Sequence, residues 1–324
     1  MMDVAGAETT AYRTVTEGCG LLDRSERGKL ALTGPEAKSF LQGQVSNDVE
    51  RLVEGQGCYA AFLTPKGKML GDLRILDAGD ELLLDTERVA LQELFNMIRR
   101  YSVGYQVQLH KRTLECCLWS LIGPASDQLI PGVPKREHAH MLVELDGVPA
   151  RAIRTDVGLD LLAPGSCSEA LGAELERRGA VPIPEAVAEC VRIERGRPRY
   201  GIDLDDSVIP QEAGLNERAV SFTKGCYVGQ ETVARLYYRG KPNRQLRGLR
   251  LSGSAPAGDE LRVGDRTVGV LTSVAESPRL GSIALALMRR EAPLGATVEV
   301  GQGDVHAEVV ELPFAAALYD RPSG

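Results

Sequence analysis

The most informative segment of this chain is the octapeptide Lys224-Gly225-Cys226-Tyr227-Val228-Gly229-Gln230-Glu231. It places one cysteine between two glycines, which let the backbone turn sharply and leave the thiol uncrowded. The composition of residues 231–238 is compatible with a helix, so Cys226 is predicted at or just before a helix N-terminus. A helix N-terminus or the nearby Lys224 would favour thiolate over thiol. A tight turn around a small buried cysteine is the alternative interpretation.

The complete octapeptide resembles the signature K-G-C-[FY]-x-G-Q-E of the YgfZ-type folate-binding proteins, relatives of the glycine-cleavage T-protein (aminomethyltransferase). The resemblance implies an α+β fold with T-protein-like modules around a central opening. Two interleaved α+β modules would occupy residues 1–240, and a small β-barrel residues 241–324. It also implies tetrahydrofolate, or a one-carbon derivative, as ligand and Cys226 as a catalytic residue. The residues that would support Cys226 are Lys224, Gly225, Tyr227, Gly229, Gln230 and Glu231.

Several segments within roughly the first 75 residues also resemble the T-protein superfamily and occur in the same order. They include residues 40–49, 55–57 and 66–73. In the T-protein its last piece typically reads G-G-x-x-D-D-L, with the second aspartate near the reactive nitrogens of tetrahydrofolate. Asp72 falls on that position, and Gly71 replaces the first aspartate. The resemblance implies a catalytic carboxylate that accepts a proton or stabilises an iminium. Capping the turn before a strand is the alternative role of Asp72. Asn47 lies in the same run and is assigned to the folate site.

Four further residues are assigned to the folate site by resemblance. Asp160 lies where the T-protein carries a glutamate that holds the pterin by paired hydrogen bonds. Such a contact is charge-assisted. The alternative is that Asp160 is a strand residue that faces solvent. Arg192 and Glu194 match the R-L-E of a T-protein helix, and Glu212 lies in a shared segment, as a ligand contact or a helix cap. An earlier arginine of that helix falls on Ala188, which argues against T-protein-like binding of the folate tail.

The hydrophobic pattern predicts an α+β N-terminal region followed by a β-rich C-terminal one. Strands are predicted at 28–33, 58–64, 69–76, 81–85, 106–110 and 114–122, and a hairpin at 141–162. Helices are predicted at 34–41, 87–101, 168–178 and 184–195, with Val89, Leu94, Met97, Ile98 and Tyr101 sharing one face. From Arg244 onward, short strands between glycine turns predict a small barrel or sandwich. Those strands are 246–251, 260–263, 267–274, 283–288, 297–300 and 307–312.

Composition limits the class of protein. A chain of 324 residues suits two or three domains. The sequence contains no run of eighteen apolar residues, so no membrane helix is expected. The formal net charge of −7 argues against a large nucleic-acid surface, although a basic strip runs from Arg235 to Arg250. Seven scattered cysteines without a secretion signal predict a reducing cytoplasm. No C-x-x-C occurs, and His138 and His140 form the one histidine pair, so no metal site is expected.

Three functions follow from these resemblances. The first is a YgfZ-type protein that binds tetrahydrofolate and supports iron–sulfur enzymes or their assembly factors, including enzymes that thiolate tRNA bases, through Cys226. The second is a tetrahydrofolate-dependent aminomethyltransferase with Asp72 as its catalytic residue and a lipoyl-carrier protein as partner. The third is a folate sensor or scaffold whose Cys226 is structural. The octapeptide and Ala188 favour the first, whereas the retained Asp72 favours the second.

Overall fold

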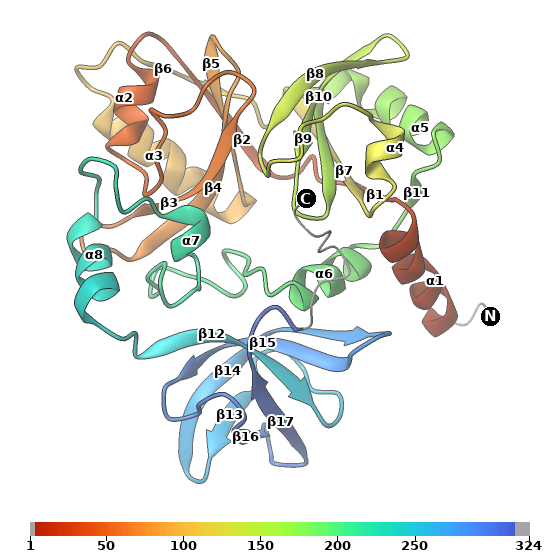
Figure 1. The fold of residues 1–324 in the computed structure, drawn as a ribbon, viewed down its shortest axis with the longest axis vertical. Helices are drawn as coiled ribbons and strands as arrows, with labels where there is room; N and C mark the ends of the chain where they lie inside the picture. The colour runs from red at the N-terminus through yellow and green to blue at the C-terminus, as the bar shows by residue number, and fades with distance from the viewer. Residues whose placement is uncertain (1–3, 315–324) are drawn as a thin grey trace. The chain divides into compact units, whose positions relative to one another are not determined.

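The computed structural model describes residues 4–314 and divides the chain into two compact units (Figure 1). Unit 1 comprises Met1–Pro184 and Glu217–Gln230, and unit 2 comprises Glu185–Asn216 and Glu231–Gly324. Both units mix helices with antiparallel sheet, and unit 2 contains a closed barrel, so the predicted α+β class with a C-terminal barrel is confirmed. No helix within the described residues is long and apolar enough to cross a membrane.

The first sheet of unit 1 has five strands. Helix α3 (Leu91–Tyr101) packs against two of them, β2 (Gly28–Thr33) and β4 (Met69–Asp77). Leu94, Met97 and Ile98 of α3 are buried, whereas Val89 and Tyr101 are exposed, contrary to the predicted common face. Val89 lies in a 3₁₀ turn at 88–90, whose period differs from that of the helix, and Tyr101 is the last residue of α3. In spatial order the strands are β3 (Gly57–Leu63), β4 (Met69–Asp77), β5 (Glu81–Thr86), β2 (Gly28–Thr33) and β6 (Gln108–Lys111). Helix α2 (Ala37–Gln42) follows β2.

The second sheet of unit 1 has six strands and its own apolar core, which includes Leu121, Leu159 and Leu171. Residues 141–162, predicted as a hairpin, belong to three consecutive strands, because Asp146-Gly147 and Gly158 all adopt positive φ and allow two reversals. In spatial order the strands are β11 (Val181–Pro182), β1 (Gly20–Asp23), β7 (Cys116–Ile122), β10 (Gly158–Pro164), β9 (Val148–Arg154) and β8 (His140–Leu145). The helices of this part are α1 (Val4–Glu17), α4 (Ser126–Leu129) and α5 (Ser168–Arg177), and α7 (Asn216–Ala219) leads into the Cys226 segment.

Unit 2 contains a closed six-stranded barrel. Helix α6 (Glu185–Glu194) packs on two of its strands, β14 (Arg266–Ser277) and β15 (Gly281–Arg289). Ile193 of α6 meets Leu246, Ile283 and Leu285 in one buried cluster, and alternate residues of the strands fill the barrel. All six predicted C-terminal strands are present, as a barrel and not a sandwich. In spatial order they are β12 (Arg244–Leu251), β15 (Gly281–Arg289), β14 (Arg266–Ser277), β13 (Glu260–Val263), β16 (Thr297–Val300) and β17 (Val305–Val310).

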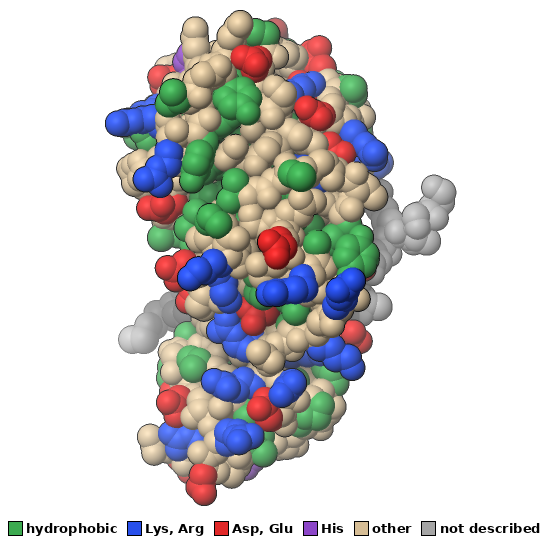
Figure 2. Space-filling view, turned by 90° about the vertical axis from the view of Figure 1, so that its left-hand side faces the viewer, with side chains coloured by type: hydrophobic (Ala, Val, Ile, Leu, Met, Phe, Trp, Pro, Cys, Tyr) green, Lys and Arg blue, Asp and Glu red, His purple; other side chains and the backbone are tan. Residues whose placement is uncertain are grey.

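Helix α8 (Gln230–Arg239) occupies the segment whose composition predicted a helix. The basic strip follows its second half: Arg235, Arg239 and Lys241 are exposed. Lys and Arg side chains are numerous on the face that Figure 2 shows, interspersed with carboxylates. This mixture is typical of a solvated surface and does not by itself indicate a nucleic-acid partner.

Candidate functional site

A buried carboxylate on β4 is the centre of the polar cluster in unit 1. Asp72 is 5% exposed, and its Oδ2 accepts a hydrogen bond of 2.7 Å from the hydroxyl of Tyr59 on β3. The register opposes Ala61 to Asp72 and Tyr59 to Arg74, so the four residues share one face of the sheet. Asp72 lies in the middle of β4, and therefore does not cap the turn before the strand.

Asp72 has an unusual protonation equilibrium. Burial raises its pKa from 3.8 to about 6, and the Tyr59 hydrogen bond opposes the shift only in part. The Glu87 carboxylate adds to the increase, while Arg27 acts against it. Burial and the Asp72 charge also keep the pKa of Tyr59 well above its usual value, so this phenol remains a donor at neutral pH. Asp72 can thus hold or release a proton near neutral pH.

Ion pairs connect the Asp72 face of the five-stranded sheet with the six-stranded sheet. Arg27 donates to Asp85 across 2.6 Å, and Arg74 donates to Asp85 across 2.5 Å and to Asp160 on β10 across 2.7 Å. Ser120 on β7 donates to the other oxygen of Asp160 across 2.6 Å. Asp160 therefore points inward and is not a solvent-facing strand residue. Each of its oxygens already has a protein partner, and its contact with the pterin stays a prediction.

Two buried polar atoms of this cluster have no hydrogen-bond partner among residues 4–314. They are Nε of Arg74 and Nδ1 of His138. The His138 ring stacks on Tyr59, with 6.5 Å between ring centroids and 28° between planes, and its backbone has φ of 66°. Burial and the neighbouring arginines lower the pKa of His138 to about 3, so its imidazole is neutral. Unusual backbone conformations of this kind cluster at functional sites.

Asn47 and Arg218 position the Tyr59 segment. Asn47 donates its side-chain amide to the carbonyl oxygens of Tyr59, across 2.8 Å, and of Arg218, across 3.2 Å. The Arg218 guanidinium lies 5.3 Å from the centre of the Tyr59 ring and pairs with Glu137. Asn47 is therefore beside the cluster, as the folate assignment requires, but its donors are used within the protein.

The octapeptide forms a loop that hydrogen bonds hold in place and that carries one exposed thiol. Lys224 is 8% exposed, and its ammonium donates to the carbonyl oxygens of Gln42, Val45 and Asn47 across 2.5, 2.7 and 2.9 Å. Three bonds use all three donors of an ammonium. Burial lowers the pKa of Lys224 to about 8. Lys224 therefore anchors the loop, and its influence on the Cys226 thiol stays a prediction.

The other residues of the octapeptide explain why the loop is rigid. Tyr227 is buried, and the Lys224 ammonium lies 5.0 Å from the centre of the Tyr227 ring. Gly229 has a φ of 85°. A Cβ at Gly229 would lie 2.6 Å from the Thr64 carbonyl oxygen, so this position requires glycine. Cys226 is exposed, which excludes the buried-cysteine alternative, and it precedes the first residue of α8, Gln230, by a short turn. Gly225 and Glu231 are also exposed.

The remaining predicted folate residues lie in unit 2, and protein partners engage each of them. Arg192 donates to Asp203 across 2.7 Å and to Ser273, and Glu194 accepts from Ser277 across 2.5 Å. Glu212 accepts the Ile209 N–H across 3.1 Å and pairs with Arg244. Glu212 thus closes a turn, and its folate contact stays a prediction together with those of Arg192 and Glu194. Ala188 is buried in α6.

The replacement of the first T-protein aspartate by Gly71 has a steric reason. A Cβ at Gly71 would lie 2.5 Å from the Phe62 ring and 2.7 Å from Cβ of Ala90. Any side chain at this position would require repacking of a buried ring. Position 71 therefore has no room for a carboxylate, whereas Asp72 points to the opposite face of β4.

Sequence reasoning missed several members of the unit 1 cluster, namely Arg27, Tyr59, Arg74, Asp85, Ser120, His138 and Arg218. A signal was available for one of them. Asp72 and Arg74 alternate within the otherwise apolar strand 69–76, which places two charges on one face of a buried strand. No group of three or more His, Cys, Asp or Glu side chains within the described residues is arranged to hold a metal ion.

Comparison with known proteins assigns both parts of the chain. Residues 2–224 match the model of the GCVT N-terminal domain, and residues 244–315 match that of the glycine cleavage T-protein C-terminal barrel domain. A putative chloroplastic transferase of Arabidopsis thaliana is 30% identical over 92% of this chain and 72% of its own length. An aminomethyltransferase of Rubrobacter xylanophilus is 30% identical over 98% of this chain and 88% of its own length.

A solved structure supports the fold. The glycine cleavage system aminomethyltransferase T of Bartonella henselae superposes with a TM-score of 0.85 over 95% of this chain and 89% of its own chain. Its sequence is 24% identical, so this likeness concerns the fold alone.

Proposed function

The chain belongs to the glycine cleavage T-protein family, and from this membership we propose that it is a tetrahydrofolate-dependent aminomethyltransferase that works through Asp72. Proteins of this family use tetrahydrofolate, which supplies the nitrogen atoms that take up the one-carbon unit. The observation that carries the proposal is the burial of Asp72 with one hydrogen bond and a pKa of about 6. Perturbed carboxyl groups of this kind are typical of catalytic sites.

The residues around Asp72 fit a pterin. A pterin edge presents both N–H donors and nitrogen or carbonyl acceptors. Arg74 Nε and His138 Nδ1 are buried atoms that lack a hydrogen-bond partner in the described part of the chain. Leaving buried polar atoms unpaired costs free energy, about 1–3 kcal/mol each. A ligand that pairs with them would recover this free energy. The Tyr59 ring adds an aromatic surface next to Asp72.

Asp72 would act as the proton acceptor and as the negative charge near the reacting nitrogen. A carboxyl group with a pKa of about 6 is mostly ionised at pH 7 but can still be protonated reversibly. Tyr59 would hold the carboxylate in one orientation through its hydroxyl. Arg27, Asp85 and Arg74 would fix the strands on which both residues lie.

A one-carbon transfer assay tests the proposal. An aminomethylated lipoyl-carrier protein is incubated with tetrahydrofolate and the protein, and the folate product is measured by mass spectrometry. We expect product with the wild type and a decrease of about 10²–10⁴-fold with Asp72→Asn, the range for loss of a general acid–base group. The exposed Asp80→Asn serves as the matched control. Undiminished transfer by Asp72→Asn would reject the role of Asp72.

Support of iron–sulfur enzymes is the second candidate function, and one observation favours it. Of the seven cysteines, Cys226 is the one classed as exposed, and Lys224, Tyr227 and Gly229 hold its loop in place. Aminomethyl transfer through Asp72 gives no role to an exposed thiol. The same thiol in a YgfZ-type protein would act on iron–sulfur clients in a reducing compartment such as the cytoplasm.

Complementation distinguishes the candidates. Cells that lack this protein are supplied with wild type, Cys226→Ala or Asp72→Asn, and the activity of their iron–sulfur enzymes is measured. Loss of rescue with Cys226→Ala alone would support the iron–sulfur function. Full rescue by Cys226→Ala would reject the thiol mechanism, and would leave the folate scaffold or the aminomethyltransferase.

A further inference from the structure

Unit 2 carries exposed positive charge that the proposed function does not use. Residues 230–247 contain five Lys or Arg side chains and one carboxylate, Glu231, in a chain whose formal net charge is −7. Two further arginines, Arg289 and Arg290, lie at the end of β15. Such a local excess of positive charge attracts anionic partners, even to a protein that is acidic as a whole.

The linker between α8 and β12 brings these charges together. It contains Lys241, and the carbonyl oxygen of its Asn243 accepts the N–H of Arg290 across 3.1 Å. Next to this contact, the antiparallel register pairs Arg244 with Arg289. The end of α8, the linker and the end of β15 are therefore neighbours within unit 2.

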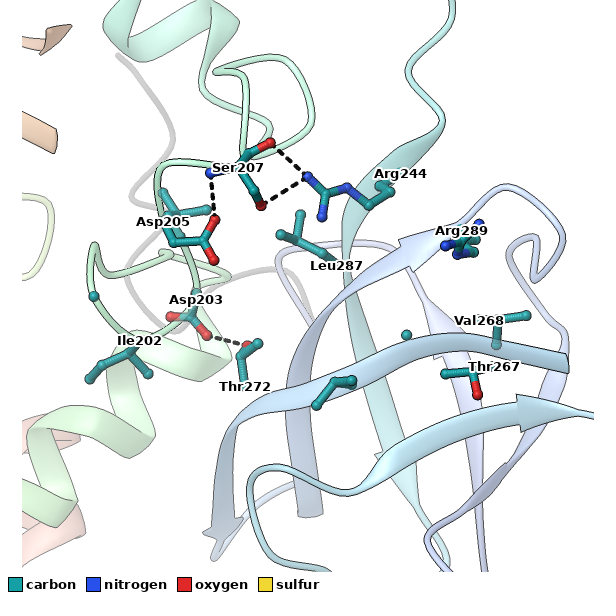
Figure 3. A pocket seen from close by; sticks show the side chains of 14 residues that line it. Ile202, Asp203, Asp205, Ser207, Arg244, Thr267, Val268, Thr272, Leu287 and Arg289 are labelled. Atoms are coloured by element: carbon teal, nitrogen blue, oxygen red, sulfur yellow. Dashed lines mark hydrogen bonds between the residues drawn. The ribbon is translucent and has the colours of Figure 1, made fainter. Parts of the chain in front are cut away.

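Five of these cations are exposed and have no ion pair within residues 4–314. We call them the cationic surface: Arg235, Arg239, Lys241, Arg289 and Arg290. Arg244 differs, because its guanidinium pairs with Glu212 across 3.2 Å and donates to the Ser207 carbonyl oxygen across 3.0 Å. Figure 3 shows the Arg244 guanidinium turned toward Ser207 and Arg289 apart from it on the barrel. The protein thus compensates Arg244 and leaves the cationic surface to an anion from outside.

Two exposed tyrosines lie among the cationic side chains of α8. Tyr237 is 48% exposed and Tyr238 is 66% exposed, and their ring centroids are 5.0 Å apart with 79° between the ring planes. Tyr238 follows Arg235 by three residues, so the two side chains are neighbours on the helix surface. Proteins hold single-stranded nucleic acids with this combination, because aromatic rings stack on unpaired bases while Lys and Arg contact the phosphates.

Other anionic partners would use less of this surface. A helix that binds a membrane presents a broad apolar face, whereas Val233 of α8 is buried and Leu236 is half-buried. A nucleic-acid duplex keeps its bases stacked inside and offers none to the tyrosines. An acidic polypeptide would pair with the cations but has no regular series of flat rings.

We propose that the cationic surface and the tyrosines of α8 bind single-stranded nucleic acid. The phosphates follow the cations from α8 through Lys241 to Arg290, and an unpaired base stacks on Tyr238. The surface is small, so it holds a short stretch of nucleotides. It lies within unit 2, and the inference is independent of the folate chemistry proposed for unit 1.

Fluorescence anisotropy with labelled oligonucleotides and the full chain tests the proposal. The probes are oligouridine and oligothymidine of about twelve nucleotides, a length within the usual site sizes, and a duplex of the same length. We expect saturable binding of the single strands that weakens as the salt concentration rises, because phosphate contacts release counterions. The duplex, and poly-L-glutamate as a competitor, should bind at least about tenfold more weakly, since neither offers a base to stack. Tighter binding of oligouridine than of oligothymidine would identify RNA as the ligand, and equal binding would mean that both nucleic acids are accepted.

Matched variants locate the surface. Tyr238→Ala should weaken binding about tenfold, the effect of one lost base stack, whereas Tyr238→Phe keeps the ring and should bind as the wild type does. Lys241→Gln and Arg290→Gln should each weaken binding and reduce the slope of log K against log salt concentration by about 0.7. The controls are Tyr101→Ala and Arg88→Gln, at exposed side chains of unit 1, and both should leave binding unchanged.

Three results would each overturn the proposal. The first is absence of saturable binding of both single strands. The second is undiminished binding by Tyr238→Ala. The third is equally tight binding of poly-L-glutamate, which would indicate an acidic polypeptide as the partner in place of a nucleic acid.

Discussion

Two buried aspartates, Asp72 in unit 1 and Asp203 in unit 2, show how the number of hydrogen-bond donors around a buried carboxylate can differ within one chain. Asp203 is 2% exposed and accepts four hydrogen bonds, one of them from the Arg192 guanidinium. Asp72 is 5% exposed, and its carboxylate accepts one hydrogen bond within the described residues, from the neutral Tyr59 hydroxyl. Burial alone therefore does not distinguish the two carboxylates, whereas the number and charge of their hydrogen-bond donors do.

We expect the largest change in the free energy of unfolding from substitution of Asp203. Asp203→Ala leaves the Arg192 guanidinium buried without its main acceptor, which should reduce the free energy of unfolding by about 3–5 kcal/mol. Urea denaturation monitored by circular dichroism measures this change. The exposed neighbour Asp206→Ala is the control and should change stability by less than about 0.5 kcal/mol. A loss below about 1 kcal/mol at Asp203 would show that its partners are not the reason for its burial.

Substitution of Asp72 should increase the free energy of unfolding, whereas substitution of Asp203 should decrease it. The pKa of Asp72 is about 6 in the folded protein and 3.8 in the reference state, so between these values the folded state binds more protons and stability falls as the pH rises. Above pH 6 the ionised carboxylate costs about 3 kcal/mol, from about two pKa units. Asp72→Asn should remove most of this cost at pH 8 and little at pH 4.

Urea unfolding at both pH values tests that sign, with Asp80→Asn as the exposed control. Stabilisation by Asp72→Asn at pH 8 that disappears at pH 4 supports an under-compensated carboxylate. Destabilisation at pH 8 would mean that Asp72 is compensated as Asp203 is, and the distinction between the two residues would fail.

Lys224 extends the comparison to a buried cation. Lys224→Met leaves three carbonyl oxygens of the 42–47 segment without their donor and should reduce stability by about 2 kcal/mol. Amide hydrogen exchange in the Cys226 loop should accelerate, because the anchor of this loop is lost. Lys66→Met, at an exposed lysine of the same unit, is the control. Unchanged exchange around Cys226 would argue against an anchoring role.

The smallest effect on stability is expected at the exposed thiol. Cys226→Ser should change the free energy of unfolding by less than about 0.5 kcal/mol. Burial raises the pKa of Cys19, Cys58 and Cys190 to about 12, so these thiols should react late. Iodoacetamide at pH 6.5 followed by peptide mapping should therefore label Cys226 first. Uniform labelling of the seven cysteines would contradict the structure of the loop.

The sequence predicts strands and helices well where the apolar period is regular. Residues 28–33, 260–263 and 297–300 are strands with the predicted bounds, because short alternating runs end at glycine or charged turns. The prediction of one hairpin at 141–162 is wrong, because three strands follow one another there. The period of apolar residues alone does not locate the two chain reversals, which depend on glycine. Helix α1 and the short strand β1 lack a distinct pattern and were not predicted.

The candidate site is predictable only in part. Asp72 and Cys226 stand out because they lie in specific motifs, whereas Tyr59 and His138 meet Asp72 through strand register and loop conformation. These contacts join residues far apart in the chain, and no local pattern encodes them. Lys224 shows the same limit: its contacts with the 42–47 carbonyl oxygens join residues about 180 positions apart, and the octapeptide alone does not predict them.

A calorimetric titration of tetrahydrofolate into wild type, Asp72→Asn and the Asp80→Asn control at pH 7 tests whether the Asp72 carboxylate meets folate. We expect saturable binding to wild type and control, weakened about tenfold or more by Asp72→Asn, since a charged hydrogen bond to the ligand is lost. Equal binding by Asp72→Asn and wild type, or no binding at millimolar ligand, would mean that the Asp72 carboxylate is not part of a folate site.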